Sequence, residues 1–209
     1  MKTIESAYIN ALLADAAYRP VTASMSQGEL LGELETRMTT TQATFIAQNF
    51  EVLSSIETPT LLGMGFDAVA WRGKAGSDYA GKVFVSMRGT QGVQDIADDV
   101  ALATRGIPHQ QIADMVNWWL KNTASISNTN VQQIKVVETI VSLVPPLSTY
   151  SFALDKTTNG TGALSDVGVI EAVNGHSLGG YLATAFTRLF GANVQSGNAA
   201  NETHFRSAA

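Results

Sequence analysis

The sequence contains no cysteine, which excludes disulfide bonds and metal sites built from thiolates. No apolar run approaches the roughly 20 residues of a membrane span. Lysine and arginine form no cluster, and the formal net charge is -5, so a nucleic-acid partner is not expected. The N-terminus also lacks a classical signal peptide, because Glu5 and Asp15 interrupt its apolar pattern.

What remains is the composition of a folded globular chain. Of the 209 residues, 45% are hydrophobic and 15% are charged, which separates the chain from disordered sequences. This length is enough for one domain with a sizeable core. We therefore expect a single domain over 1–209, divided into a helical extension over 1–58 and a sheet core over 59–209.

The first part of the chain carries the apolar spacing of amphipathic helices. This spacing predicts helices over 4–17, 26–38 and 41–55. Thr40 or Thr41 is expected to cap the third helix, since a threonine hydroxyl can accept a free N–H of the first turn.

Three more helices are predicted farther along the chain. The segment 109–121 places its apolar residues on one face, and 131–144 is similarly patterned until Pro145 and Pro146 stop it. The segment 178–191 is amphipathic and ends at a glycine.

Strand-like segments lie between these helices. Residues 61–73 alternate in polarity, and 82–89 are rich in β-branched and aromatic residues. The turn-forming stretch "KAGSDYAGK" joins them, so the two should pair as a hairpin. Residues 167–173 predict a short buried strand. Strands that alternate with helices indicate an α/β fold with a helical N-terminal extension.

The segment "VNGHSLGGYLATAF" contains the pattern glycine, any residue, serine, any residue, glycine, formed by Gly175, Ser177 and Gly179. A predicted strand precedes it and a predicted helix follows it, which is the context of a nucleophile elbow. There the turn pushes the serine side chain out over the sheet edge, and bare neighbours allow strand and helix to pack closely. The N–H of Leu178, at the helix N-terminus, would face developing negative charge.

Other interpretations of this segment stay open. A glycine-rich turn between a strand and a helix is common without catalysis. His176 is beside Ser177, but a neighbouring side chain on an elbow points away from the serine hydroxyl. We therefore expect His176 to be buried beside the sheet and not to act as a base.

"GHSLGG" resembles the elbow of the class 3, or fungal-type, triacylglycerol lipases. "VFVSMRGT" followed by "QGVQDIADDV" resembles a second segment of that family, although Ile96 replaces its usual tryptophan. The resemblance implies that Thr90 donates to the oxyanion through its N–H and hydroxyl, and that Asp99 holds this hydroxyl. From the residues alone, Thr90 could instead cap a helix, Asp99 could be a solvated acid, and Arg88 is expected to form a structural ion pair.

"MKTIESAYINALLADAAY" and "DMVNWWLKNT" further resemble large bacterial lipases that carry C-terminal calcium-binding glycine-rich repeats. The resemblance implies an α/β-hydrolase fold with a mostly parallel sheet flanked by helices, and hydrolysis of lipid esters. It implies no cofactor, except calcium held by a C-terminal region that this sequence does not include. It also favours secretion without a classical signal peptide, with a cytoplasmic location as the alternative.

A serine hydrolase of this fold needs an acid and a histidine after the serine, in that order. After Ser177 the sequence offers only Glu202 and His204, two residues apart. Each further strand–helix unit takes about 30 residues, so the remaining chain cannot place both on separate loops. His109 precedes the serine at a predicted helix start. We therefore expect an N-terminal piece of a longer lipase, inactive or weakly active by itself.

Two segments bear on the substrate. Residues 91–104 and 131–155 could each cover an acyl pocket and open at a lipid surface, or could simply pack in the core. The acidic turn "DIADD" lacks the ligand spacing of a calcium loop. The expected function is lipid ester hydrolysis through an acyl-Ser177 intermediate. The alternatives are a thioesterase, acyltransferase or peptidase, and a non-catalytic domain that binds lipid or a partner.

Overall fold

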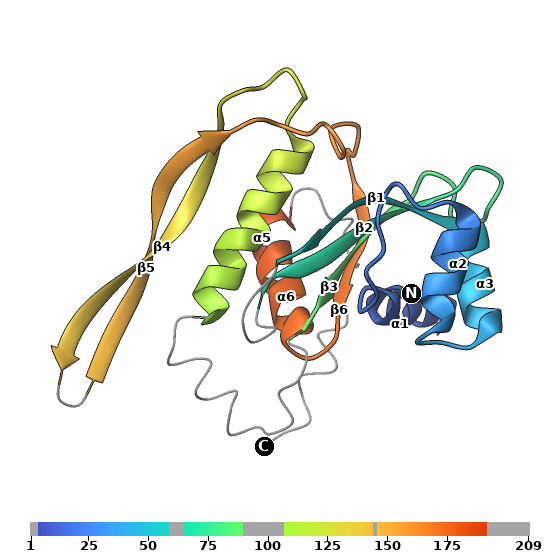
Figure 1. The fold of residues 1–209 in the computed structure, drawn as a ribbon, viewed down its shortest axis with the longest axis horizontal. Coiled ribbons are helices and arrows are strands. Elements are labelled where there is room, and N and C mark those ends of the chain that lie inside the picture. The colour runs from blue at the N-terminus through green and yellow to red at the C-terminus, as the bar shows by residue number, and fades with distance from the viewer. Residues whose placement is uncertain (1–3, 59–64, 90–106, 144–145, 192–209) are drawn as a thin grey trace. The chain divides into compact units, whose positions relative to one another are not determined.

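A computed structural model describes residues 4–58, 65–89, 107–143 and 146–191 (Figure 1). These residues form five helices and six strands, so the expected mixture of α-helices and β-strands is confirmed. The chain divides into two compact units. Of the described residues, the first unit contains 4–58, 67–89 and 167–191, and the second contains 65–66, 107–143 and 146–166.

The helices at the N-terminus are α1 (Ile4–Ala16), α2 (Gln27–Glu35) and α3 (Thr40–Asn49). α2 and α3 each begin with a capping box: the side chain of the N-cap residue accepts the backbone N–H three residues later, and the side chain of that later residue accepts the N-cap N–H. In α3 the cap is Thr39 and its partner is Gln42, so the expectation that Thr40 or Thr41 caps this helix is wrong.

The predicted third helix is too long. α3 ends at Asn49, and the chain continues directly as strand β1 (Phe50–Glu57). The helical extension therefore stops before residue 50, and most of 50–58 belongs to the sheet. Taken alone, residues 50–57 show the two-residue period of a strand and not the spacing of a helix. They alternate in burial, with Phe50, Val52 and Ser54 turned inward.

The main sheet has the strand order β1-β2-β3-β6, with β2 (Asp67–Gly73), β3 (Val83–Arg88) and β6 (Ile170–Gly175). β2 and β3 pair antiparallel, so the predicted hairpin is confirmed. β1 also pairs antiparallel with β2, and only β3 and β6 run parallel. Within the described residues, the expectation of a mostly parallel sheet is therefore wrong, because β1, β2 and β3 pair antiparallel in succession and β6 alone joins by a parallel pairing.

Helices cover both faces of this sheet. α1 and α6 each pack against β3 and β6, and Figure 1 shows them on opposite sides. Phe84 and Ala172 belong to the core under the N-terminal helices, whereas the alternation of side chains directs Val85 and Val173 to the other face. α6 (Leu178–Phe190) buries Leu182, Ala183 and Phe186. The elbow serine stands at the start of this second covering helix.

The second unit pairs α5 (Ile107–Thr123) with a long hairpin of β4 (Val131–Leu143) and β5 (Pro146–Thr158). The helix predicted over 109–121 is confirmed. The helix predicted over 131–144 is wrong, because this β-branched segment pairs with β5 instead. The Asn117 side chain links α5 to β4, since it donates to the Ile134 carbonyl and accepts from the Ile134 N–H, both at 2.8 Å.

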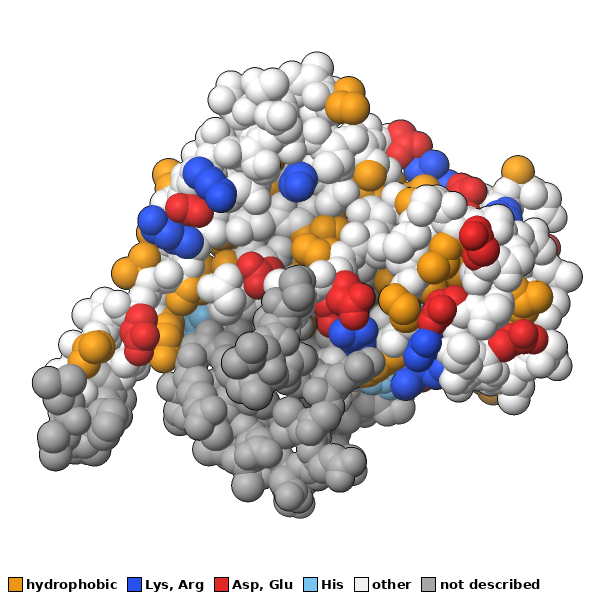
Figure 2. Space-filling model, in the orientation of Figure 1, with side chains coloured by type: hydrophobic (Ala, Val, Ile, Leu, Met, Phe, Trp, Pro, Cys, Tyr) orange, Lys and Arg blue, Asp and Glu red, His pale blue; other side chains and the backbone are white. Residues whose placement is uncertain are grey.

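The hairpin exposes apolar side chains. Ile140, Val141, Phe152 and Leu154 are all exposed, and Figure 2 shows hydrophobic atoms along this projection. The idea that 131–155 covers an acyl pocket stays a prediction, and the other lid candidate, 91–104, lies outside the described residues. Among the helices that the structure describes, none combines the length and apolar character needed to cross a membrane.

Candidate nucleophile elbow

Ser177 occupies a sharp turn between a buried strand and a helix. β6 ends at Gly175, and α6 begins at Leu178, so the strand–turn–helix expected from the sequence is present. Ser177 has φ 54° and ψ -127°, and no other non-glycine residue in the described parts of the chain has a positive φ. Such a conformation costs roughly 1–3 kcal/mol, which the surrounding packing must supply. The Ser177 side chain is exposed at this strained position.

Three glycines explain how the elbow packs. A Cβ on Gly179 would lie 2.2 Å from the Met87 carbonyl oxygen, and one on Gly175 would lie 2.5 Å from the Gly179 carbonyl. A Cβ on Gly89 would lie 2.8 Å from the His176 carbonyl oxygen. These distances leave no room for any side chain. The elbow therefore rests backbone against backbone on the end of β3, which is the tight packing that the sequence pattern predicted.

The first turn of α6 presents backbone N–H groups near Ser177. The Gly179 N–H donates to the His176 carbonyl and the Gly180 N–H donates to the Ser177 carbonyl, both at 2.9 Å. Leu178 is the first helical residue, so its N–H has no acceptor within the helix. A helix N-terminus carries partial positive charge, and it therefore favours an oxyanion at this position.

Tyr18, which follows α1, contacts the elbow, although no sequence pattern singles it out as a site residue. Its hydroxyl accepts the Gly89 N–H at 3.2 Å, and its ring centroid lies 6.3 Å from that of His176. The Arg37 guanidinium lies 4.4 Å above the same ring, and Arg37 also pairs with Asp15. Tyr18 thus connects the end of α1 to the end of β3, just before Thr90.

We expect Tyr18→Phe to lower the free energy of unfolding by about 1–3 kcal/mol, because it leaves the buried Gly89 N–H without its acceptor. Denaturant titration measures this change. Tyr8→Phe is the matched control, since Tyr8 is half exposed on α1 and should change stability by less than about 0.5 kcal/mol. Equal stability of the two variants would show that the Tyr18 hydroxyl contributes nothing.

Arg88 forms the structural ion pair expected for it. Its guanidinium contacts the Asp67 carboxylate of the neighbouring strand, and both side chains are about nine-tenths buried. The more exposed Glu57 lies 3.5 Å away, and the Thr58 N–H donates to Asp67 at 2.9 Å. Burial raises the pKa of Asp67, while the Thr58 N–H and the Arg88 charge oppose this rise. Together with Glu57, this ion pair links β1, β2 and β3 at the end of the sheet next to the elbow.

Asn174 immediately precedes Gly175 on β6 and is fully buried. Neither polar atom of its amide has a partner among the described residues. A buried amide without partners lowers stability, and most buried polar side chains in proteins are hydrogen-bonded. Asn174, next to the strained turn, is therefore unusual. The sequence showed only an asparagine between apolar strand residues and gave no sign of this burial.

Thr90, Asp99, Glu202 and His204 lie outside the described residues. His109 belongs to the second unit, where its ring stacks on Tyr150 at 5.1 Å between centroids.

His176 was expected to be buried beside the sheet, and this expectation is wrong. Its side chain is exposed, because the turn carries it beyond the last strand residue, Gly175. No residue of the described ranges is hydrogen-bonded to the Ser177 hydroxyl, so these parts of the chain do not assign a base.

The described residues contain no group of three or more histidine and acidic side chains arranged to hold a metal ion. Comparison with known proteins gives no assignment either: no family model, curated protein or solved structure matches this chain. The elbow geometry therefore carries the functional argument.

Proposed function

We propose that this chain carries the nucleophile elbow of a serine hydrolase that cleaves carboxylic esters, with lipid esters as the substrate class. Ser177 is the nucleophile and forms an acyl-serine intermediate. The N–H groups of Leu178 and Thr90 stabilise the oxyanion, and Asp99 orients the Thr90 hydroxyl. Gly175 and Gly179 permit the close packing of the elbow. The roles of Thr90 and Asp99, the lipid preference and secretion of the protein all rest on the resemblance to class 3 lipases.

The conformation of Ser177 carries this proposal. An ordinary glycine-rich turn would place glycine at a positive φ, because a serine there is strained. Here the chain keeps a serine at φ 54°, exposes its side chain, and places glycines at the two flanking positions where a Cβ would clash. A strained, exposed serine beside a helix N-terminus whose first N–H has no acceptor within the helix is the arrangement that acyl transfer requires.

Labelling with a fluorophosphonate tests the proposal. We expect Ser177 to be modified selectively but slowly, because an oxyanion site without an assigned base retains only about 10³–10⁴-fold acceleration over water. Peptide mapping after labelling identifies the modified serine, and Ser177→Ala should abolish the signal. Ser165→Ala is the control, since Ser165 is also exposed but its hydroxyl only donates to the Gly162 carbonyl.

Two results would overturn parts of the proposal. Labelling spread evenly over exposed serines would remove Ser177 as a nucleophile and leave a binding role for the domain. Rapid stoichiometric labelling at Ser177 would show that the chain does contain a working base. p-Nitrophenyl esters of graded acyl length, compared with thioester and peptide substrates, then separate ester hydrolysis from the other acyl-transfer activities.

A further inference from the structure

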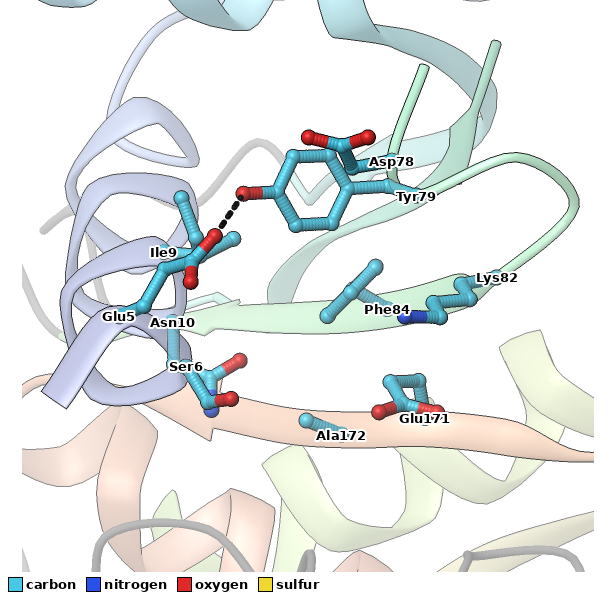
Figure 3. Close-up of a pocket in the computed structure, with 10 residues that line it drawn as sticks. All are labelled: Glu5, Ser6, Ile9, Asn10, Asp78, Tyr79, Lys82, Phe84, Glu171 and Ala172. Carbon is cyan, nitrogen blue, oxygen red and sulfur yellow. Dashed lines mark hydrogen bonds between the residues drawn. The ribbon is translucent and has the colours of Figure 1, made fainter. Parts of the chain in front are cut away.

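The strands that lead to the elbow border a cavity at their opposite end. A cavity of about 240 Å³ lies between α1 and the first residues of β3 and β6 (Figure 3). Phe84 and Ala172 are on its floor, whereas Met87 and Gly175 lie at the elbow end of the same strands. All of its lining residues belong to the first unit.

Acceptor groups dominate the polar lining of this cavity. It includes the carboxylates of Glu5, Asp78 and Glu171, against a single ammonium group, that of Lys82. Figure 3 shows Glu5 on α1 and Glu171 on β6, so the charges approach from different elements. The excess of negative charge makes the cavity favourable for a cation.

Asn10 gives an independent indication of a ligand. It lines the cavity from α1 and is only 5% exposed, yet its side-chain carbonyl oxygen has no hydrogen-bond partner among the described residues. A buried acceptor of this kind is normally satisfied by protein, water or ligand. A ligand that offers an N–H or O–H donor would satisfy it.

An aromatic ring completes the arrangement. The Tyr79 hydroxyl donates to Glu5 at 3.1 Å, which fixes one carboxylate at the rim (Figure 3). The Lys82 ammonium lies 5.9 Å from the centre of the Tyr79 ring, within the range of a cation–π contact. Because the Lys82 side chain is exposed, it can move to solvent and leave this position to another cation.

We propose that this cavity binds a small organic cation with N–H donors, a primary ammonium or guanidinium compound. Its N–H groups donate to the Asn10 carbonyl oxygen, and Glu5 and Glu171 balance its charge. Tyr79 and Phe84 contact its carbon atoms. The site does not depend on the chemistry of Ser177.

Binding of butylammonium to the 209-residue chain tests this site. Backbone NMR shifts should change around Asn10 and Tyr79, whereas neutral butanol and tetramethylammonium, which has no N–H donor, should leave them unchanged. Asn10→Leu should weaken binding about tenfold or more, because a hydrogen bond to a charged group is lost. Glu171→Gln, which keeps the side-chain shape, should also weaken it.

Lys82→Met should tighten binding, because it removes the competing positive charge. Asn130→Leu is the control for the asparagine variant, since Asn130 is exposed in the second unit and this change should leave binding unchanged. Ser177→Ala should also leave binding unchanged. Equal responses to butylammonium and tetramethylammonium would overturn the proposal, because they indicate counter-ion attraction alone. Weaker binding after Lys82→Met would overturn it as well, because it would show that Lys82 contributes to the ligand site.

Discussion

Gly179→Ala is expected to lower the free energy of unfolding by about 3 kcal/mol or more and to abolish selective labelling of Ser177. The new Cβ would stand 2.2 Å from the Met87 carbonyl oxygen and 2.9 Å from the Gly89 nitrogen. Both contacts are with backbone, so neither can be relieved by a change of side-chain rotamer. α6 must move away from β3, and overpacking of this severity is at or above the upper end of the usual 1–3 kcal/mol.

Gly32→Ala provides the matched control. Gly32 lies inside α2, and a Cβ there would meet nothing within 4 Å. Alanine is the better helix former, so this variant should gain about 0.5–1 kcal/mol. Urea titration of both variants, with fluorophosphonate labelling under native conditions, measures the two effects. A Gly179→Ala protein as stable as wild type, with Ser177 still labelled, would contradict the packing described for the elbow.

Arg88→Met is expected to cost about 3–5 kcal/mol, because it leaves the buried Asp67 carboxylate without its partner. Denaturant titration at neutral pH measures the loss. The sheet edge that it loosens continues into Gly89, so labelling of Ser177 should slow as well. The double variant Arg88→Met/Asp67→Asn should recover part of the stability, since no uncompensated charge remains and the Thr58 N–H keeps its acceptor.

The stability loss of Arg88→Met should depend on pH in a defined direction. Burial already raises the pKa of Asp67, and removal of Arg88 removes one influence that lowers it. In the folded variant the pKa of Asp67 then lies above its value in the unfolded chain, which is about 4. Protonation of Asp67 therefore favours the folded state. The stabilising contribution is complete below the unfolded pKa and disappears as pH rises through the folded pKa. A deficit that grows on acidification would contradict this account.

The features that could be predicted from the sequence depend on short stretches of chain. The β2–β3 hairpin follows from two alternating segments joined by a turn-rich stretch, and α1, α2 and α5 follow from apolar spacing. The elbow follows from three small residues at fixed positions between a strand and a helix. Each of these patterns lies within about 30 residues, so local backbone preferences and burial act on the same segment.

Helices were predicted wrongly in segments whose apolar residues fit both the helical period and the two-residue period of a strand. Residues 131–144 contain enough apolar positions for a helical face, but valine, isoleucine and threonine are restricted at χ1 in a helix and pack well in a strand. The presence of β5 as a partner decided the outcome. Likewise, Phe50 and Leu53 fit a continued helix in sequence. Pairing of Phe50 with Gly73 and of Val52 with Trp71 makes this segment strand β1 instead.

The sequence by itself determined the position of the strained serine and the bare neighbours it requires, because both are properties of one continuous turn. Only the tertiary structure decided what supports that turn. The Tyr18 hydroxyl accepts a backbone N–H from a residue 71 positions away, and the Arg88 side chain contacts Asp67 on the neighbouring strand. Such contacts depend on how distant segments pack and on which polar groups lose water there, and no local pattern records either.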